Sequence, residues 1–566
     1  MENNKIKISH HYKSMDMIYA LTVIIFNPVV ITFYFDTQFS FPDTFSYIRE
    51  AQRILSEFQF NTGAWGHINT SMILPPVYPS MIAILMQFGF DGLHASVIIC
   101  QISGILFSLI MYFYITQYTS RIIGLIAILT VHITYVYFNL FTLAMTEAPF
   151  LLLLSMLFIC VTRLDMNKFH YYVVTGVVTG LIFLCREIGV TALFLLFIYY
   201  SIIFLQEKYP VSTYISRIFI FVLSFSFLVV PFYVLRYEQT GQLPWSRLYE
   251  LNKYNIYTDD KNLIRNIEKL KSAKINNYVD EYNKRHYLYR LSEDGKEVLG
   301  KIKYRSENNN QVKQQDKNES EIAFFLENLK NNLFNLVQST GLLIFLVFIF
   351  VTIIEFLISR NRRRVERQLV NLFLIIYLIT LSGITSQVYR YVYVLIPLIL
   401  MNNFISFYRI ILHLFQSNRI VMILFALILP VTTAYSSPKL FYNKQVYTKN
   451  HELEKNLVAL RREVKGDAVF TLYPYFAYSV GGVFRQLPND TLEKITKYAA
   501  YTNVKWMLIV DSSQVRDTMQ FWPSLNNWIN KTGYIKNNPG LEYCCGFYDK
   551  TSHSDWRLYM FRGNTH

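Results

Sequence analysis

The chain contains eleven apolar runs that reach or approach the length needed to cross a lipid bilayer, and this feature restricts the fold more than any other. A membrane-spanning helix takes roughly 17–25 residues, and within lipid only helices and closed barrels satisfy every backbone polar group. The pattern therefore predicts a polytopic α-helical membrane protein with about 11 transmembrane helices. The expected spans are residues 17–35, 95–116, 122–140, 147–161, 171–184, 188–205, 214–235, 334–358, 369–385, 391–412 and 420–435.

The composition agrees with a membrane protein and excludes several other classes. Of 566 residues, 52% are hydrophobic and only 16% are charged, whereas average globular chains carry about a quarter charged residues. Five cysteines are too few for a disulfide scaffold, and Cys100, Cys160 and Cys185 are expected to be packing residues. The net charge of +15 would favour nucleic acid in a soluble chain. Here it indicates basic cytoplasmic loops among membrane lipids, with no nucleic-acid partner.

The basic residues also predict the orientation of the chain in a plasma membrane. The densest cluster, residues 360–367, should be cytoplasmic. Counting spans from it places the N-terminus in the cytoplasm, the C-terminal tail outside, and two long loops outside, residues 36–94 and 236–333. The first loop contains an apolar run, residues 80–90, that is too short to span and is expected to lie along the outer leaflet. The second loop is polar and is expected to be partly helical, with disorder predicted for residues 306–320.

The tail predicts a second domain, so that residues 1–435 form the transmembrane domain and residues 436–566 a soluble extracytoplasmic α/β domain. Helical spacing covers residues 453–465 and stops at Gly466, and another helix is expected over 492–501. Buried-type strands are expected at 468–472 and 506–510.

Ionisable residues at membrane depth are rare and are functional candidates by default. Asp36, Asp43, Glu147, Arg186 and Arg390 all fall on the outer face under a topology derived without them. Acids and arginines that converge on one face indicate a site for an anionic, membrane-borne substrate. The alternative is that they are simply charges at the ends of spans.

The first loop carries the most specific pattern. Pro42 suits the first turn of a helix, and Asp43 complements the positive end of its dipole. Tyr47 and Ala51 follow four and eight residues after Asp43, on the same helix face. By structure alone, this is an amphipathic interfacial helix with an acidic first turn.

With these residues the chain resembles the GT-C superfamily of lipid-carrier-dependent glycosyltransferases, in particular the aminoarabinose transferase and protein O-mannosyltransferase branch. The similarity begins with Asp43, Tyr47 and Ala51 and continues, in chain order, through Pro75-Pro76, Phe88-Gly89, Thr146-Glu147, Arg186 after Gly176 and Gly180, Arg390-Tyr391 with Pro397, and the tail motifs Gly466-Asp467, Tyr478-x-x-Gly481-Gly482 and Val510-Asp511. The resemblance covers most of the chain and implies a GT-C fold with an outer α/β domain.

The resemblance implies sugar transfer from a polyprenyl-phosphate donor in the cell envelope. It gives Asp43 the role of catalytic base and makes Arg186 and Arg390 the ligands of the leaving phosphate. The remaining substrate-binding candidates are Tyr47, Glu147, Tyr391 and, more weakly, Asp36. One base without a second carboxylate nucleophile implies inversion at the sugar.

Two positions depart from the family pattern. Thr44 stands where an acidic residue often follows the loop aspartate, so a metal-binding acidic pair is unsupported. Leu74 stands where a basic residue often precedes the two prolines, so that phosphate contact must come from elsewhere. His67, His94 and His132 lack metal-ligand spacing, and no cofactor is expected.

Two other functions compete with the glycosyltransferase. A transporter or flippase of lipid-linked sugars would also have many spans and intramembrane charges, but large outer loops and a folded tail fit rocking transport poorly. A non-catalytic assembly protein would use the tail as a binding module. An assay of sugar transfer separates these functions, because only the enzyme releases free carrier phosphate.

Overall fold

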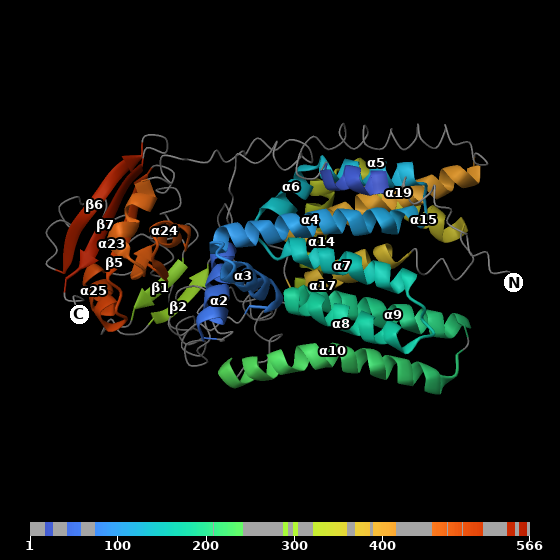
Figure 1. Cartoon of the computed structure of the whole chain (residues 1–566), viewed down its shortest axis with the longest axis horizontal. Coiled ribbons are helices and arrows are strands. Elements are labelled where there is room, and N and C mark those ends of the chain that lie inside the picture. Colours follow the sequence, from blue (N-terminus) through green and yellow to red (C-terminus); the bar gives the residue numbers. More distant parts are fainter. Residues whose placement is uncertain are drawn as a thin grey trace. The chain divides into compact units, whose positions relative to one another are not determined.

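The structure is a computed structural model of the whole chain (Figure 1). It describes residues 17–25, 42–57, 74–207, 209–240, 287–291, 298–303, 321–358, 368–384, 389–414, 456–471, 474–488, 491–512, 540–549 and 554–562. Within these ranges some side chains are not described, those of Asp43, Glu355 and Arg390 among them. Asp36, the low-complexity segment 306–320 and the expected span 420–435 lie outside the described residues.

The chain forms two compact units. The first comprises residues 1–41, 75–235 and 320–448, and the second comprises residues 42–74, 236–319 and 449–566. The second unit therefore combines the tail with most of two segments that the sequence analysis assigned to outer loops of the transmembrane domain. The expected division at residue 435 stays a prediction.

The first unit is helical, and long apolar helices make up most of it. Helices α4, α7, α8, α9 and α10 run side by side (Figure 1). At Gly176 of α8 a Cβ would lie 2.6 Å from the Phe221 carbonyl oxygen of α10, so only glycine permits this close approach. The elements are α3 (Val77–Gln87), α4 (Gly92–Thr116), α5 (Arg121–His132), α6 (Tyr135–Thr142), α7 (Glu147–Arg163), α8 (Phe169–Cys185), η1 (Glu187–Gly189), α9 (Val190–Glu207), α10 (Val211–Thr240), α14 (Glu321–Thr340), α15 (Leu342–Ile358), α17 (Leu369–Ile384), α18 (Tyr389–Tyr393) and α19 (Leu395–Leu414).

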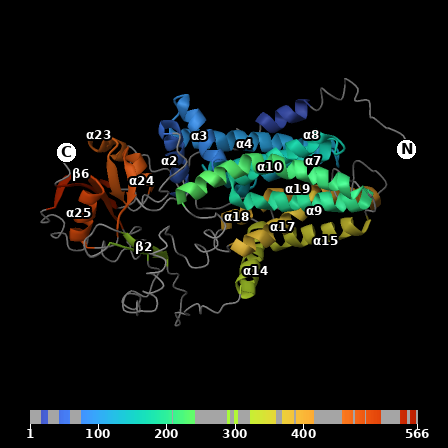
Figure 2. The same cartoon turned by 90° about the horizontal axis from the view of Figure 1, so that it is seen from below.

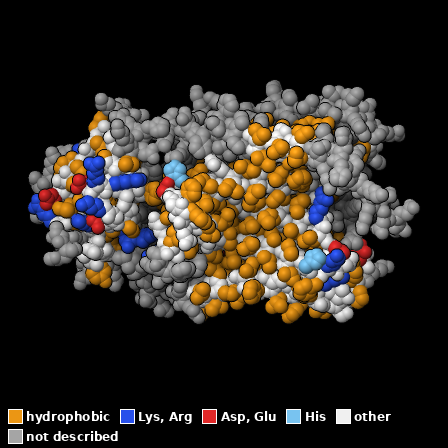
Figure 3. Space-filling view, in the orientation of Figure 1, with side chains coloured by type: hydrophobic (Ala, Val, Ile, Leu, Met, Phe, Trp, Pro, Cys, Tyr) orange, Lys and Arg blue, Asp and Glu red, His pale blue; other side chains and the backbone are white. Residues whose placement is uncertain are grey.

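Among the described residues, four helices are long and apolar enough to cross a membrane, and a bent pair would make a fifth span. The four are residues 92–116, 187–207, 211–235 and 391–412. Shorter apolar helices include α5, α8 and α17. The side of this unit that Figure 3 shows is broadly hydrophobic, with charged side chains near its edge. The long apolar helices expected of a membrane protein are therefore present, while the total of about 11 spans stays a prediction.

The expected span 334–358 is not one continuous helix. Helices α14 and α15 meet at Gly341 and are bent by 111° (Figure 2). Gly341 has φ +85°, a left-handed conformation that glycine adopts easily at the end of a helix. The side-chain amides of Asn328 and Asn332 donate to the backbone oxygen and the hydroxyl of Ser382 on α17. The polar first part of the expected span thus belongs to an amphipathic helix that packs on α17.

The expected span 122–140 is also interrupted. Helix α5 ends at His132, and α6 starts after Thr134, whose hydroxyl accepts a hydrogen bond from the Tyr137 N–H at 3.2 Å. Threonine is a favourable N-cap. This cap begins α6 within an otherwise apolar run.

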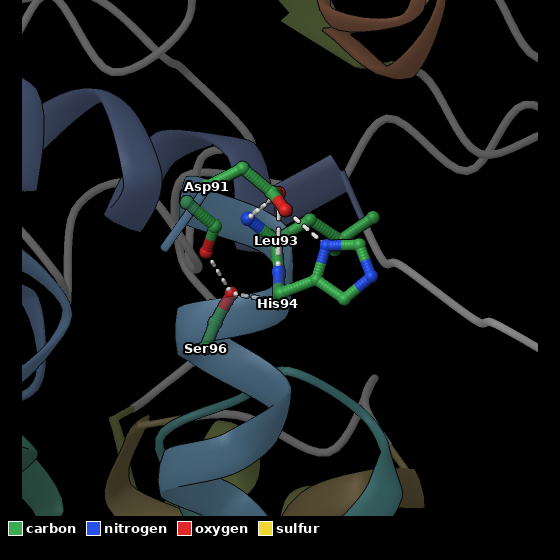
Figure 4. A network of polar contacts seen from close by, with 5 residues as sticks. Asp91, Leu93, His94 and Ser96 are labelled. Carbon is green, nitrogen blue, oxygen red and sulfur yellow. Dashed lines mark hydrogen bonds and ion pairs between the residues drawn. The ribbon is translucent and has the colours of Figure 1, made fainter. Parts of the chain in front are cut away.

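Helix α4 begins at a well-formed cap in the segment that follows α3. The Asp91 carboxylate accepts hydrogen bonds from the backbone N–H groups of Leu93 and His94 at 3.0 and 3.2 Å (Figure 4). The His94 ring contacts the second carboxylate oxygen. This carboxylate therefore compensates the unpaired N–H groups of the first helical turn.

The second unit contains an α/β fold in its C-terminal part. Its sheet has the order β4-β3-β5-β7-β6, in which β4, β3 and β5 are parallel and β7 and β6 are antiparallel to their neighbours. Helix α25 was expected within its observed bounds, and β3 and β5 lie where strands were expected. The elements are α23 (Arg461–Val464), β3 (Ala468–Thr471), α24 (Pro474–Ser479), β4 (Val483–Gln486), α25 (Leu492–Tyr501), β5 (Trp506–Ser512), β6 (Leu541–Asp549) and β7 (Ser554–Phe561).

The sheet has an apolar core on each face, because successive strand residues point to opposite sides. Phe470, Met507 and Ile509 pack with residues of α25. Val469 and Leu508 pack on the other face, with Leu460 and Val464. The α/β character expected for the tail is thus present, while its extracytoplasmic location stays a prediction.

Two further elements of this unit come from the segments between the spans. Helix α2 (Pro42–Glu57) lies where the acidic helix of the first loop was expected. An antiparallel hairpin, β1 (Tyr287–Leu291) with β2 (Val298–Lys303), lies in a loop for which only helix was expected.

Candidate functional site

Glu147 is positioned by the first turn of α7. Its side chain is buried, with 4% of its surface exposed. A carboxylate at this end of a helix interacts favourably with the positive end of the helix dipole. The helix thus helps to hold a negative charge inside an apolar bundle.

Arg186 follows the last residue of α8, where the backbone becomes extended before the short helix η1. The Gly189 N–H donates to the Arg186 carbonyl oxygen at 2.7 Å and closes this turn. A Cβ at Gly189 would lie 2.7 Å from the Ile182 carbonyl oxygen, so the turn requires glycine there. The turn directs a long basic side chain from the end of α8 into the helical unit, where it is 10% exposed.

The structure brings Glu147, Arg186 and Tyr391 together from three separate elements. Arg186 Nη2 lies 3.1 Å from Glu147 Oε1. The guanidinium carbon of Arg186 lies 4.4 Å from the centroid of the Tyr391 ring, over its face. A buried ion pair costs several kcal/mol of desolvation per ion, so a cation held this way inside a bundle is consistent with a function beyond packing.

Neighbouring side chains support this cluster, and none of them was a site candidate from the sequence. The Tyr377 hydroxyl donates to the Tyr391 carbonyl oxygen at 3.0 Å and so ties α17 to α18. The Cys185 thiol lies 3.8 Å from the Thr146 carbonyl oxygen, one residue before Glu147. The Cys100 thiol donates to the Met145 carbonyl oxygen at 3.3 Å. Two of the three thiols expected to be packing residues therefore also contact the backbone that presents Glu147.

The remaining candidates are described only in part. Arg390 precedes Tyr391 in α18, so its backbone is beside the cluster, but its side chain is not described. Asp36 lies outside the described residues. Asp43 is the second residue of α2 in the other unit, and its side chain is not described either. Tyr47 lies one turn further along α2 and is half-buried.

Helix α2 is anchored within its own unit by aromatic contact. The Phe45 ring lies 5.2 Å from the Tyr478 ring of α24, and Phe45, Ile48 and Ala51 are buried. Proline at the first helical position has a fixed φ and no N–H to satisfy. The helix start that carries Asp43 is therefore set both by local sequence and by packing.

Helix α2 also contributes a cationic cluster that was not foreseen. Burial, together with the positive charges of Arg485 and Arg53, lowers the pKa of Arg49 to about 10, and Glu50 acts in the opposite direction. Arg49 and Arg53 are one helical turn apart, which places them on one face. A spacing of four residues was the only sequence signal for this cluster, and nothing local connects it to Arg485 on β4.

No group of three His, Cys, Asp or Glu side chains is placed to hold a metal ion in the part of the chain that the structure describes. A role for a metal ion therefore stays unsupported, as it was from the sequence, where Thr44 stands in place of a second acidic residue.

Comparisons with known proteins identify the fold. Residues 74–233 match the family model for dolichyl-phosphate-mannose-protein mannosyltransferases. That segment contains Glu147 and Arg186. Curated protein sequences give no significant match.

Solved structures match over nearly the whole chain at low sequence identity. The ArnT structure from Cupriavidus metallidurans bound to undecaprenyl phosphate is 9% identical, with a TM-score of 0.51, and the match covers 99% of both chains. The Archaeoglobus fulgidus oligosaccharyltransferase with zinc and sulfate is 12% identical, with a TM-score of 0.55 over 95% of this chain and 72% of that one. The same organism's AglB with an inhibitory peptide and a dolichol-phosphate is 10% identical, with a TM-score of 0.51 over 97% and 74%.

The solved structures share the fold of this chain, and the family model matches its sequence across the helices that carry the ion pair. The chain is therefore similar to the mannosyltransferase family over residues 74–233, and it shares the fold of the ArnT and oligosaccharyltransferase structures.

Proposed function

We propose that this protein is an integral membrane glycosyltransferase that transfers a sugar from a polyprenyl-phosphate-linked donor to an acceptor on the outer face of the membrane. The observation that carries the proposal is the buried Arg186 guanidinium, held by Glu147 and Tyr391 within the segment and fold of a lipid-phosphate-sugar transferase superfamily.

The chemistry of the leaving group explains why an arginine is needed. As the bond between the anomeric carbon and the phosphate oxygen breaks, the electron pair moves to that oxygen and negative charge grows on the phosphate. A guanidinium presents five N–H donors in a planar fork, so it can bind Glu147 and a phosphate at once. In a water-poor site such a contact stabilises the developing charge strongly. Arg390, beside Tyr391, is the second candidate for this role.

The acceptor needs a base. Its hydroxyl oxygen attacks the anomeric carbon while its proton passes to a carboxylate, a step that general-base catalysis accelerates. We assign this role to Asp43, with Tyr47 on the same face of α2 as a substrate ligand. A single displacement inverts the configuration at the anomeric carbon. Glu147 is then a positioning residue, because it acts through Arg186.

The decisive test is an assay with the full-length protein in nanodiscs and polyprenyl-phosphate sugars of several kinds. The proposal expects new glycosidic product and an equal amount of free polyprenyl phosphate. Movement of intact donor between the leaflets of proteoliposomes, without release of carrier phosphate, would instead identify a flippase.

Tyr391 allows a sharper test of how Arg186 is held. A cation over an aromatic face contributes about 0.5–2 kcal/mol, so replacing Tyr391 with Leu should lower kcat/KM roughly tenfold. Tyr391→Phe retains a ring and should keep most of the activity, and the bond from Tyr377 is made to the backbone in either variant. Equal losses in both variants would show that the hydroxyl, and not the ring face, is what matters.

A further inference from the structure

A second arginine in the helical unit is held in place by neighbouring side chains, away from the proposed active site. Arg217 lies in the second turn of α10 and is half-buried. Its guanidinium carbon lies 4.6 Å from the centroid of the Tyr209 ring and 5.7 Å from that of Tyr172. Its Nη2 donates to Asn167 Oδ1 at 3.5 Å, and the Tyr209 hydroxyl donates to the same oxygen at 3.1 Å. Two rings and an amide therefore fix the orientation of this cation.

Arg217 also lines a pocket between the ends of three helices. The pocket is partly open to solvent. It lies where α8 begins, α9 ends and α10 begins, and its lining is aromatic apart from the guanidinium, a methionine and an isoleucine. The lining residues are Met166, Tyr172, Tyr200, Phe204, Tyr209, Tyr214, Arg217 and Ile218.

The surroundings place this pocket at the boundary between lipid and water. On α10, Val211, Ile215, Phe219, Leu223 and Phe227 are each more than half exposed and recur every four residues, so one face of the helix is apolar and uncovered. Only 17% of the α10 span is buried, the smallest share among the four long spans. A helix with such a face is solvated by lipid, and its first turns therefore lie at the membrane surface.

The charges at this end of the helices are mostly positive. Arg163 ends α7, Lys168 precedes α8, and Arg217 lines the pocket. The acids on the same side are Asp165, whose carboxylate accepts from the Asn167 N–H, and Glu207 at the end of α9. The basic-residue rule predicts this end to be cytoplasmic, the side opposite to the proposed active site.

We propose that this pocket binds the phosphate headgroup of an anionic phospholipid, with the Arg217 guanidinium as the phosphate ligand. Basic pockets between helix ends at a membrane surface suit such headgroups, and arginine binds phosphate through paired N–H donors. The aromatic walls contact the glycerol and upper acyl carbons, while the acyl chains stay in the bilayer around α10. The site joins α8, α9 and α10, so its occupancy stabilises their packing. It is independent of the proposed transferase activity.

The test uses the full-length protein in nanodiscs of phosphatidylcholine with increasing phosphatidylglycerol, read as the midpoint of thermal unfolding. Binding to the folded state alone raises this midpoint once the lipid exceeds its dissociation constant, and the rise continues with the logarithm of lipid concentration. Wild type should show this rise, and Arg217→Gln should need at least about tenfold more phosphatidylglycerol for the same rise, the loss expected for one charge-assisted contact. Arg163→Gln removes an equal charge from the same end outside the pocket, and should behave as wild type.

Two additional measurements keep the proposal falsifiable. Because Arg217→Gln also loses the ring contacts, Arg217→Lys is compared with it; this variant keeps the charge and should lose less affinity for phosphatidylglycerol. Inorganic phosphate added to phosphatidylcholine nanodiscs should give no stabilisation. An equal phosphatidylglycerol response in wild type and Arg217→Gln would overturn the site, and full stabilisation by inorganic phosphate would overturn its assignment to a lipid.

Discussion

Replacing Asp43 with Asn is expected to lower kcat for sugar transfer by about 10²–10⁴-fold, the range that a positioned general base contributes. The amide has nearly the same shape as the carboxylate but cannot take the proton of the acceptor hydroxyl. Asp43 is the second residue of α2, and asparagine is tolerated at a helix start. Expression, membrane insertion and the thermal unfolding midpoint should therefore match those of the wild type.

A matched control is available at another helix start. Asp91 caps α4 by accepting from the N–H groups of Leu93 and His94 (Figure 4). Asparagine caps helices about as well as aspartate, so Asp91→Asn makes the same chemical change and should retain wild-type turnover. Initial rates with saturating donor and acceptor compare the two variants.

The result also decides between the candidate carboxylates. Normal turnover by Asp43→Asn would remove Asp43 from catalysis and leave Asp36 and Glu147 as candidate bases. A loss of activity that appears only in KM would make Asp43 a substrate ligand, because a base that acts in the transition state lowers kcat.

The parts of the fold that the sequence predicted are those governed by local patterns. The apolar runs gave α4, α7, α8, α9, α10, α17 and α19 to within a few residues, because a helix in lipid satisfies its own hydrogen bonds whatever its neighbours are. Helix α25 was also predicted within its observed bounds, and the structure shows Thr491 as its N-cap. The strands β3 and β5 stood out as short apolar runs.

The helix breaks and the β1–β2 hairpin depend on interactions that cannot be read from local sequence patterns. Helix α14 ends before Gly341 and packs on α17, where Asn328 and Asn332 bind Ser382, 54 and 50 residues away in the sequence. The hairpin of β1 and β2 lies in a polar segment, where alternation is weak because neither face has to be apolar. The cluster at Arg49 and the pocket at Arg217 likewise join residues from different elements.

The candidate site shows the same division. Glu147 and Arg186 were selected because ionisable residues at membrane depth are rare, and Tyr391 was selected because it matches a motif of the family that the chain resembles. Their mutual distances could not be predicted, since the three residues lie on α7, after α8 and on α18. Tyr377 carried no signal at all, as one of 43 tyrosines. The sequence therefore identified the two members of the ion pair, and the structure adds side chains that support them, such as Tyr377.

Replacing Arg186 with Gln is expected to have two separable effects. Loss of a donor aimed at developing charge typically costs about 10²–10³-fold in kcat. The change also leaves the Glu147 carboxylate, only 4% exposed, without its ion-pair partner, and breaking a buried pair costs about 3–5 kcal/mol of unfolding free energy. Arg186→Lys keeps the charge but loses the planar fork, so it should be more stable than Arg186→Gln and still clearly impaired.

The double variant Arg186→Leu with Glu147→Leu separates catalysis from stability. Well-packed apolar residues often replace a buried ion pair at little cost or with a gain, so this variant should unfold near the wild-type temperature. It should nevertheless be inactive, because no cation remains at this position to bind the leaving phosphate. Thermal unfolding in nanodiscs and single-turnover transfer rates give the two readouts on one preparation. Wild-type transfer by a stable double variant would limit the pair to a structural role and shift the phosphate contact to Arg390. A stable, inactive double variant would show instead that the buried charges are kept for the reaction and not for the fold.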